Sequence, residues 1–342
     1  MHITLIDDSI AFDGASPATI PLGAAEKSFA LLAGALAKSG HDVHVFNRTL
    51  QPGVVDGAHW AGWAGARPPK TDVLIGFRKA ELLGFVPEAR KRMIWLSGAA
   101  SYLGNSPHRA WLATKKPIVV FMSRSHSDGF ENLDGLRLAL IPPGIGAPFL
   151  VEAIPEPVNP PRAIATAHPL HGVDWLVELW REKIHPILPH AELHLYSAAL
   201  EKAGRGEPIA AAFARVAAIV GAAAGANVMV KKPLADPAMA EAFRAARVHL
   251  HPGHASDVYC HTVGESQSCG LPAVVRPRGA ARERIAHNAT GFAHADDDAF
   301  AMATLRLLGD EATYRRMSDA ARAMQRGRSW AEAASDFEMH WG

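Results

Sequence analysis

The chain has 342 residues, which is enough for two domains that each bury a core of their own. Hydrophobic residues make up 49% of it and charged residues 20%, a composition that excludes long disordered tracts. The formal net charge is +1, and the 35 lysines and arginines form no long basic run, which argues against nucleic acid as a partner.

Cysteines, histidines and apolar runs exclude further classes of protein. Cys260 and Cys269 are too few for a disulfide framework, and we expect reduced thiols in a cytoplasmic protein. The 18 histidines are scattered without the spacing of helical metal-ligand pairs, so the sequence predicts no metal site. The first residues lack the pattern of a signal peptide, and no apolar run approaches the ~18 residues of a membrane span. Peripheral contact with a membrane stays open.

Short apolar runs alternate with alanine-rich helical stretches in the first half of the chain. A run at 2–7, a helix over 26–40 and a second run at 41–46 indicate a βαβ unit and therefore a parallel sheet. Further strands, each short, apolar and bounded by turn residues, are predicted at 72–77, 92–97 and 117–123. These elements predict a doubly wound α/β domain over residues 1–155.

Prolines and glycines are dense between Leu140 and Pro161, where they resist both helix formation and strand pairing, so we expect a linker there. After it the alternation of strands and helices resumes, which predicts a second doubly wound domain over residues 160–326. The last stretch, 327–342, is amphipathic and carries aromatic side chains. We expect it to form a helix that packs back on the first domain.

Residues 251–275, HPGHASDVYCHTVGESQSCGLPAVV, hold the most informative pattern. A strand leads into a loop, a helix begins, and a Gly-Leu-Pro turn leads into another strand. This order places a helix N-terminus at the carboxyl edge of a parallel sheet, where backbone N–H groups and the helix dipole favour an anion such as a diphosphate. Asp257 lies in the loop and Glu265 in the helix, with seven residues between them, so we expect both carboxylates to face one cleft.

This pattern resembles the signature of the retaining GT-B glycosyltransferases of the large nucleotide-sugar-dependent group, the group 1 type. That signature has an acid, seven residues, a glutamate, a helix turn of small residues and Gly-Leu-Pro. Here it stands as Asp257, VYCHTVG, Glu265, SQSC, Gly270, Leu271 and Pro272. Similar stretches extend the resemblance over nearly the whole chain, at 21–46, 123–149, 165–180 and 296–334. The resemblance implies two Rossmann-like, doubly wound domains that face a central cleft.

The resemblance also implies how a nucleotide sugar would bind. Glu265 would bind the ribose hydroxyls of the nucleotide, and Asp257 would contact the hydroxyls of the donor sugar. Backbone N–H groups would bind the phosphates at four successive positions, Tyr259, Cys260, His261 and Thr262. Gly23, in a loop before the first long helix, would approach the donor phosphates or the acceptor.

Positive charge for the diphosphate is expected from three side chains. His171 stands where relatives carry Arg or Lys before a glycine, and a bound diphosphate would raise its pKa and recruit a proton. Lys231 and Lys232 follow a predicted strand that ends at the same edge of the sheet, and one of them would add a second charge. Asp257, His171 and Lys231 are therefore the expected catalytic residues.

Three positions depart from the family pattern. Asp257 is one methylene shorter than the usual Glu, and His171 is a weaker cation than Arg. Ser97 stands near a position where relatives often have a His or an acid that meets the acceptor.

The activity that the resemblance implies is metal-independent transfer of a hexose from a UDP- or GDP-sugar to an acceptor hydroxyl, with retention at the anomeric carbon. The nucleotide sugar would be a substrate, no further cofactor is expected, and the acceptor would be a glycan, a lipid or a small metabolite. Two alternatives stay open. One is a nucleotide-sugar-binding protein of the same fold that has lost catalysis, as the three departures suggest. The other is an epimerase or hydrolase of the same fold.

Overall fold

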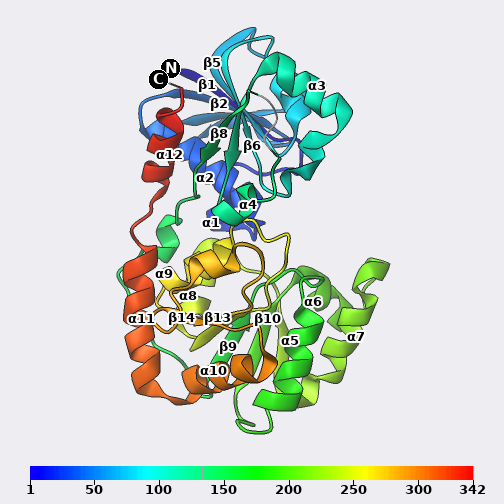
Figure 1. Ribbon diagram of the computed structural model, residues 1–342, viewed down its shortest axis with the longest axis vertical. Helices are drawn as coiled ribbons and strands as arrows, with labels where there is room; N and C mark the ends of the chain where they lie inside the picture. The colour runs from blue at the N-terminus through cyan, green and yellow to red at the C-terminus, as the bar shows by residue number, and fades with distance from the viewer. Residues whose placement is uncertain (132–134, 342) are drawn as a thin grey trace. The chain divides into compact units, whose positions relative to one another are not determined.

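The computed structural model describes residues 1–131 and 135–341 (Figure 1). Residues 132–134, inside the segment 123–149 that resembles the family, lie outside the described part, as does residue 342.

The chain divides into two compact units. Unit 1 comprises Met1–Gly146 together with Arg328–Gly342, and unit 2 comprises Ala147–Gly327. The first boundary therefore falls after Gly146 rather than at residue 155, and the last stretch of the chain belongs to unit 1.

Unit 1 is built on an eight-stranded sheet with the strand order β3-β4-β2-β1-β5-β6-β7-β8. Its strands are β1 (His2–Ile6), β2 (Asp42–Asn47), β3 (Gly53–Val55), β4 (Ala58–Gly62), β5 (Lys70–Phe77), β6 (Glu88–Trp95), β7 (Ile118–Phe121) and β8 (Arg137–Leu140). Its helices are α1 (Ser16–Thr19), α2 (Ala24–Lys38), α3 (Ser106–Lys115), α4 (Arg124–Ser127) and α12 (Trp330–Glu338). Strands β1 and β2 pair in parallel on either side of α2 in the sequence, which is the βαβ unit predicted there.

One hairpin in unit 1 was not predicted. Strands β3 and β4 pair antiparallel, and the two residues between them, Asp56 and Gly57, both have positive φ angles, of 51° and 83°. Asp-Gly with two positive φ angles is typical of the tight hairpin turn whose twist matches that of its strands. This dipeptide was the available sequence signal for the hairpin.

Helix α12 packs within unit 1 through aromatic side chains. The ring of Phe337 lies 5.3 Å from that of Trp95 in β6, and Trp95 lies 4.8 Å from Phe77 in β5. At the end of the helix the Glu338 carboxylate pairs with His41 at 3.2 Å. The helix begins at a capping box in which the side chains of Ser329 and Glu332 each accept a hydrogen bond from the other residue's backbone N–H.

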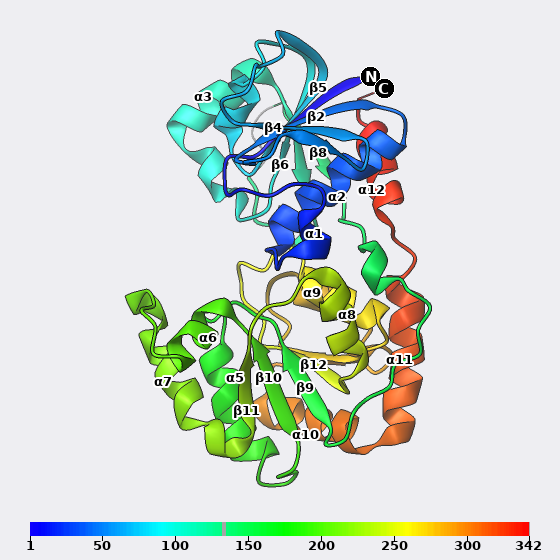
Figure 2. The same ribbon diagram turned by 180° about the vertical axis from the view of Figure 1, so that it is seen from behind.

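Unit 2 is built on a six-stranded sheet with the order β11-β10-β9-β12-β13-β14, parallel throughout (Figure 2). Its strands are β9 (Arg162–Ala165), β10 (Glu192–Tyr196), β11 (Val228–Lys231), β12 (Val248–His251), β13 (Ala273–Val275) and β14 (Gly291–Ala293). Its helices are α5 (Val173–Leu179), α6 (Ala198–Gly204), α7 (Ala214–Ala222), α8 (Asp236–Arg244), α9 (His261–Ser268), α10 (Asp297–Gly309) and α11 (Glu311–Gln325).

The two faces of this sheet differ in character, as β12 shows. Val248 and Leu250 point to the apolar core formed with α5, α7 and α10. His249 points to the opposite face, where its ring lies 5.7 Å from that of Phe243 in α8 and its Nδ1 bonds Ser266 in α9. The strand sequence VHLH thus alternates between an apolar face and a polar one.

Within residues 1–131 and 135–341, every helix is too short or too polar to cross a lipid bilayer. Two parallel-sheet, Rossmann-like domains confirm the predicted fold class.

Candidate functional site

The candidate site lies in unit 2, where the direction of chain winding reverses. From β9 the chain winds outward to β10 and β11, and it then returns to add β12, β13 and β14 on the other side of β9. Ligands of open α/β sheets bind outside the carboxyl ends of the strands at such a reversal. Here that place is formed by the segment that follows β9 and by residues 252–262, which follow β12 and lead into α9 (Figure 2).

Asp257 is held at this edge by three groups. One carboxylate oxygen, Oδ2, accepts a hydrogen bond from the backbone N–H of His254 at 2.9 Å and lies 2.9 Å from Nε2 of His251. The other oxygen, Oδ1, lies 3.4 Å from Nδ1 of His171. Burial by itself would raise the pKa of Asp257, but the hydrogen bond and charge of His251, with the other two groups, lower it below its usual value. Asp257 is therefore ionised at neutral pH.

His171 is part of a group of imidazoles around that carboxylate. Its ring stacks on that of His254 with a centroid distance of 4.1 Å and an interplanar angle of 11°, and the ring of His168 lies 5.0 Å away. Burial and the neighbouring His254 lower the pKa of His171, although Asp257 opposes them. The position expected to carry a cation is therefore mostly neutral at pH 7 in the free protein.

The helix that follows begins with free backbone donors. Cys260 is the N-cap residue of α9, in the left-handed backbone region at φ 56° and ψ 58°. The first N–H groups of any helix have no acceptor within the helix itself. In α9 the backbone N–H groups of Cys260 and Thr262 also find no acceptor elsewhere among the described residues, so both are available to a ligand. The Cys260 Sγ lies 3.6 Å from Nε2 of His251, and burial raises the pKa of this thiol.

A buried polar network ties α9 to the sheet. The ring of His249 bonds Thr166, the residue after β9, at 3.1 Å and Ser266 of α9 at 2.8 Å. Thr166 in turn donates to the hydroxyl of Thr262 at 2.8 Å. Burial lowers the pKa of His249 to about 3, so the network is neutral. His249 was not predicted as a site residue, although a polar residue in an otherwise apolar strand is a signal for a buried, hydrogen-bonded side chain.

Tyr259 packs against Arg284, and its ring lies 4.8 Å from that of His261. The Arg284 guanidinium donates to the tyrosine hydroxyl at 2.8 Å and lies over its ring at 4.5 Å. A Cβ atom at Gly264 would collide with the same guanidinium, so the side chain of Arg284 fills the space that this glycine leaves. The other acid of the motif, Glu265, lies in α9 with 5% of its surface exposed.

The two lysines do not join this group. Lys231 is the last residue of β11 and lies opposite Tyr196 of β10 in the sheet. Burial and the charge of Arg162, together with the charge of Lys231, lower the pKa of His194 to about 4. β10 and β9 lie between β11 and β12 in the sheet. Three inter-strand spacings of about 4.8 Å therefore separate Lys231 from the end of β12, roughly 14 Å in all. Lys231 and Lys232 form no ion pair with a described residue.

Gly23 and Ser97 belong to unit 1. Gly23 is the N-cap residue of α2 at φ −63°, where its missing side chain leaves room for the Glu26 carboxylate. Ser97 follows β6. The carboxyl edge of this sheet also carries an ion-paired cluster that the sequence analysis missed, in which Arg78 bonds Glu26 at 2.6 Å and faces the buried Asp7 at 3.5 Å.

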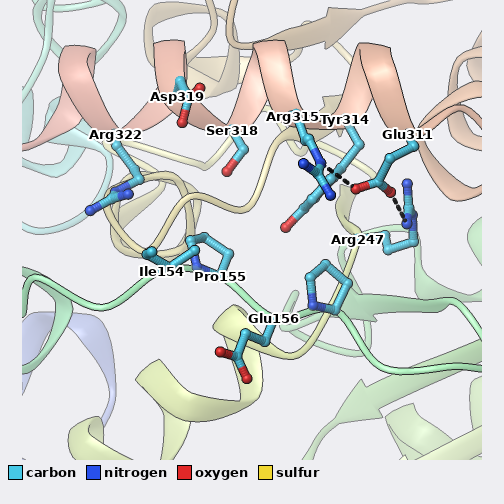
Figure 3. A pocket seen from close by; sticks show the side chains of 11 residues that line it. Ile154, Pro155, Glu156, Arg247, Glu311, Tyr314, Arg315, Ser318, Asp319 and Arg322 are labelled. Carbon is cyan, nitrogen blue, oxygen red and sulfur yellow. Dashed lines mark hydrogen bonds and ion pairs between the residues drawn. The ribbon is translucent and has the colours of Figure 1, made fainter.

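A cavity of about 520 Å³ lies elsewhere in unit 2, between the segment 154–157 and α11 (Figure 3). Arg247, which lines it, directly precedes β12, so this cavity borders the amino end of that strand and not its carboxyl end. Glu311 in its wall pairs with Arg247 at 2.8 Å and with Arg315 at 2.6 Å. Among the residues that line the cavity, three carboxylates balance three guanidiniums, which makes the cavity a poor place for a diphosphate; they are Glu156, Glu311 and Asp319 against Arg247, Arg315 and Arg322.

Comparisons with known proteins agree with this architecture. Residues 163–310 match the family model described as glycosyl transferases group 1. No curated protein matches the sequence. Sucrose-phosphate synthase from Thermosynechococcus elongatus is similar in structure with a TM-score of 0.73 at 15% identity, over 99% of this chain and 98% of that one.

Two further solved structures align with this chain over almost the whole length of each protein. Anabaena HepE in complex with UDP and glucose has a TM-score of 0.67 at 13% identity, over 99% of this chain and 98% of that one. The UDP-forming α,α-trehalose-phosphate synthase from Burkholderia vietnamiensis has a TM-score of 0.67 at 12% identity, over 100% and 99%. At such identities the likeness shows the fold. Residues 163–310 match a group 1 glycosyl transferase domain, and the chain as a whole has the GT-B fold.

Proposed function

We propose that the protein is a glycosyltransferase that moves a sugar from a UDP- or GDP-sugar to an acceptor hydroxyl with retention of anomeric configuration and without a metal ion. One observation carries the proposal. At the winding reversal of unit 2, the unpartnered N–H groups of Cys260 and Thr262 stand beside the anchored carboxylate of Asp257. A diphosphate fits the first feature and the hydroxyls of a sugar fit the second. The proposal takes further support from HepE, which was solved with UDP and glucose.

The donor would be bound along α9. Its diphosphate accepts hydrogen bonds from the N–H groups at the start of the helix, and its sugar hydroxyls donate to Asp257. Glu265, about one turn along the helix, takes the ribose hydroxyls. Asp257 is ionised and already accepts a hydrogen bond from the His254 backbone, so it suits a role in orienting the sugar rather than in attacking it.

The leaving group needs positive charge as the bond to the anomeric carbon breaks. The N-terminus of α9 supplies part of it. His171 supplies more, because a diphosphate beside it raises its pKa and recruits a proton. His254, which stacks on His171, is a second imidazole close to the bound diphosphate. Lys231 lies on the edge strand β11, three strands away from β12. With these groups in place the transfer does not require a divalent cation.

The transfer itself balances without a protein base. The acceptor oxygen forms a bond to the anomeric carbon on the face that the diphosphate leaves, the bond from that carbon to the diphosphate oxygen breaks, and the acceptor proton passes to the departing phosphate. Attack from the same face retains the configuration.

A donor panel tests this function. Purified full-length protein is incubated with UDP-, GDP-, ADP- and TDP-sugars, and both thermal stabilisation and release of nucleotide are measured. We expect one donor to stabilise the protein and to release its nucleotide when an acceptor is present, with the anomeric configuration kept in the product by NMR. Glu265→Ala should lose both effects, and Glu207→Ala, at an exposed glutamate of the same unit, should keep both. The absence of any response would refute the nucleotide-sugar assignment.

The two alternative functions give different results in the same assay. Stabilisation without release, with every acceptor offered, would favour a nucleotide-sugar-binding protein, which the departures at Asp257, His171 and Ser97 motivate. Turnover in the absence of an acceptor would favour a hydrolase or an epimerase, and analysis of the sugar product separates those two.

A further inference from the structure

We propose that His251, Asp257 and Cys260 form a binding site for a thiophilic divalent cation such as Zn²⁺, which competes with the nucleotide sugar. The site goes beyond the proposed function. Binding of the ion depends on these three residues alone, and only its inhibitory effect rests on the proposed transfer.

The three ligand atoms are already gathered. Nε2 of His251, a carboxylate oxygen of Asp257 and Sγ of Cys260 all lie within 4.8 Å of one another. His251 lies at the end of β12, Asp257 lies in the loop and Cys260 starts α9, so a short stretch of chain on one sheet edge presents all three. The side chains of His251 and Asp257 are 7% and 13% exposed, which keeps competing water away.

The distances suit a tetrahedral ion. Zn²⁺ binds nitrogen and oxygen at about 2.0–2.2 Å and sulfur at about 2.3 Å, which in tetrahedral geometry separates the ligand atoms by roughly 3.3–3.6 Å. Sγ of Cys260 and Nε2 of His251 are 3.6 Å apart. Nε2 and Oδ2 of Asp257 are 2.9 Å apart and need to separate by only a few tenths of an ångström.

The donor set selects the metal. A thiolate with an imidazole and a carboxylate is a combination that Zn²⁺ uses, whereas Mg²⁺ demands oxygen ligands in an octahedron. Three protein ligands leave a fourth position open for water or for an oxygen of a phosphate. His171, 3.4 Å from the other oxygen of Asp257, can hold that carboxylate in place when the ion is bound.

Two further features of the chain agree with this site. Cys260 has a positive φ of 56°, a region that glycine would occupy more freely than a residue with a side chain. In the metal-free protein Nε2 of His251 donates to the ionised Asp257, and Nδ1 makes no hydrogen bond to a described residue. The ion therefore displaces the proton from Nε2, and the proton can be carried on Nδ1 instead.

Occupation by the ion has a direct consequence for the donor. The Asp257 oxygen that binds the ion is no longer available to the donor sugar. Zn²⁺ should therefore weaken donor binding in competition, and Mg²⁺ at the same concentration should have no effect.

Cobalt titration tests the site independently of activity. Full-length protein, freed of metal and of any histidine tag, is titrated with Co²⁺, which gives a thiolate-to-metal absorption band when a cysteine binds it. We expect one Co²⁺ per chain with that band, displaced by Zn²⁺. Cys260→Gly, which also relieves the backbone strain, should lose the band and weaken Zn²⁺ binding at least tenfold, and His251→Asn should weaken it similarly.

The other cysteine is the matched control. Cys269 lies at the opposite end of α9, 1% exposed, and Cys269→Ser should keep the band. A band that survives Cys260→Gly, or Co²⁺ binding without a thiolate band, would overturn the site. In the nucleotide-release assay, Zn²⁺ should raise the apparent KM for the donor in the wild type but not in Cys260→Gly. A protein that binds Co²⁺ through Cys260 and shows no transfer would retain this metal site while refuting the proposed function.

Discussion

At the scale of single residues, the imidazoles around Asp257 set how the site responds to pH. Burial and His254 hold the pKa of His171 below its usual value in the free protein. A diphosphate bound beside it would raise that pKa, so binding takes up a proton. His171 then has a higher pKa in the complex than in the free protein. Donor affinity should rise as the pH falls between these two pKa values, and it should be constant at pH values below the lower one.

We therefore expect the donor Kd to fall severalfold between about pH 8 and about pH 6, since one unit of pKa shift corresponds to roughly tenfold in affinity. Calorimetric titration with the nucleotide sugar found by the donor panel measures it. In His171→Arg the charge is permanent, so the slope should be reduced. Equal slopes in both proteins would show that His171 does not meet the diphosphate.

The signature acids could be predicted from spacing, because Asp257 and Glu265 lie in one continuous stretch. The partners of Asp257 could not. His171 comes to it from the segment after β9 and His251 from the end of β12, and their contact depends on which strands are neighbours in the sheet. Lys231 illustrates the same limit. It ends a strand at the expected edge, but the strand order places it well away from Asp257.

At the scale of elements, the position of α9 depends on His249. Its ring bonds Thr166 and Ser266 in the interior, and burial lowers its pKa to about 3, against about 6.5 in an unfolded chain. Between these values the unfolded state binds one more proton than the folded state at this residue. The free energy of unfolding therefore falls as the pH decreases from about 6.5, by up to roughly 1.4 kcal/mol per pH unit from this group.

His249→Leu should remove that part of the pH dependence. It should also lower the free energy of unfolding at pH 7 by about 2–3 kcal/mol, because two hydroxyls lose a buried partner. Urea unfolding at several pH values measures both effects, with His190→Leu, at an exposed histidine, as the control. An unchanged slope in His249→Leu would mean that His249 is not buried in the neutral form.

Most elements were readable from the sequence because their strands are short runs with a clear pattern, alternating in β12 with VHLH and continuously apolar in β7 with IVVF. The pair β3 and β4 was missed because each strand is short and half-exposed. Only the turn at Asp56 and Gly57 distinguishes it locally, and a two-residue signal is weak beside a full strand pattern.

At the scale of the whole molecule, the end of the chain completes the core of unit 1. Phe337 in α12 is 1% exposed and packs on Trp95, although more than two hundred residues separate them. The boundary at Gly146 could not be predicted from proline density alone, because the linker prolines continue into the first segment of unit 2.

Phe337→Ala should destabilise unit 1 by about 3–5 kcal/mol, the usual cost of emptying an aromatic site in a core. Differential scanning calorimetry should show a lowered transition for unit 1. The transition of unit 2, which lacks this residue, should move less. Met339→Ala, at an exposed position of the same C-terminal segment, is the control. A wild-type melting curve in the Phe337 variant would show that α12 is not part of the core of unit 1.

We propose that the start of α9, at the winding reversal of unit 2, binds the diphosphate of a nucleotide sugar. Amide NMR of the labelled protein, titrated with the donor that the panel identifies, observes that contact at the residues concerned. We predict that the amide resonances of Cys260 and Thr262 shift most, because those N–H groups gain acceptors. Shifts gathered at the cavity beside α11, with those two amides unmoved, would contradict the account.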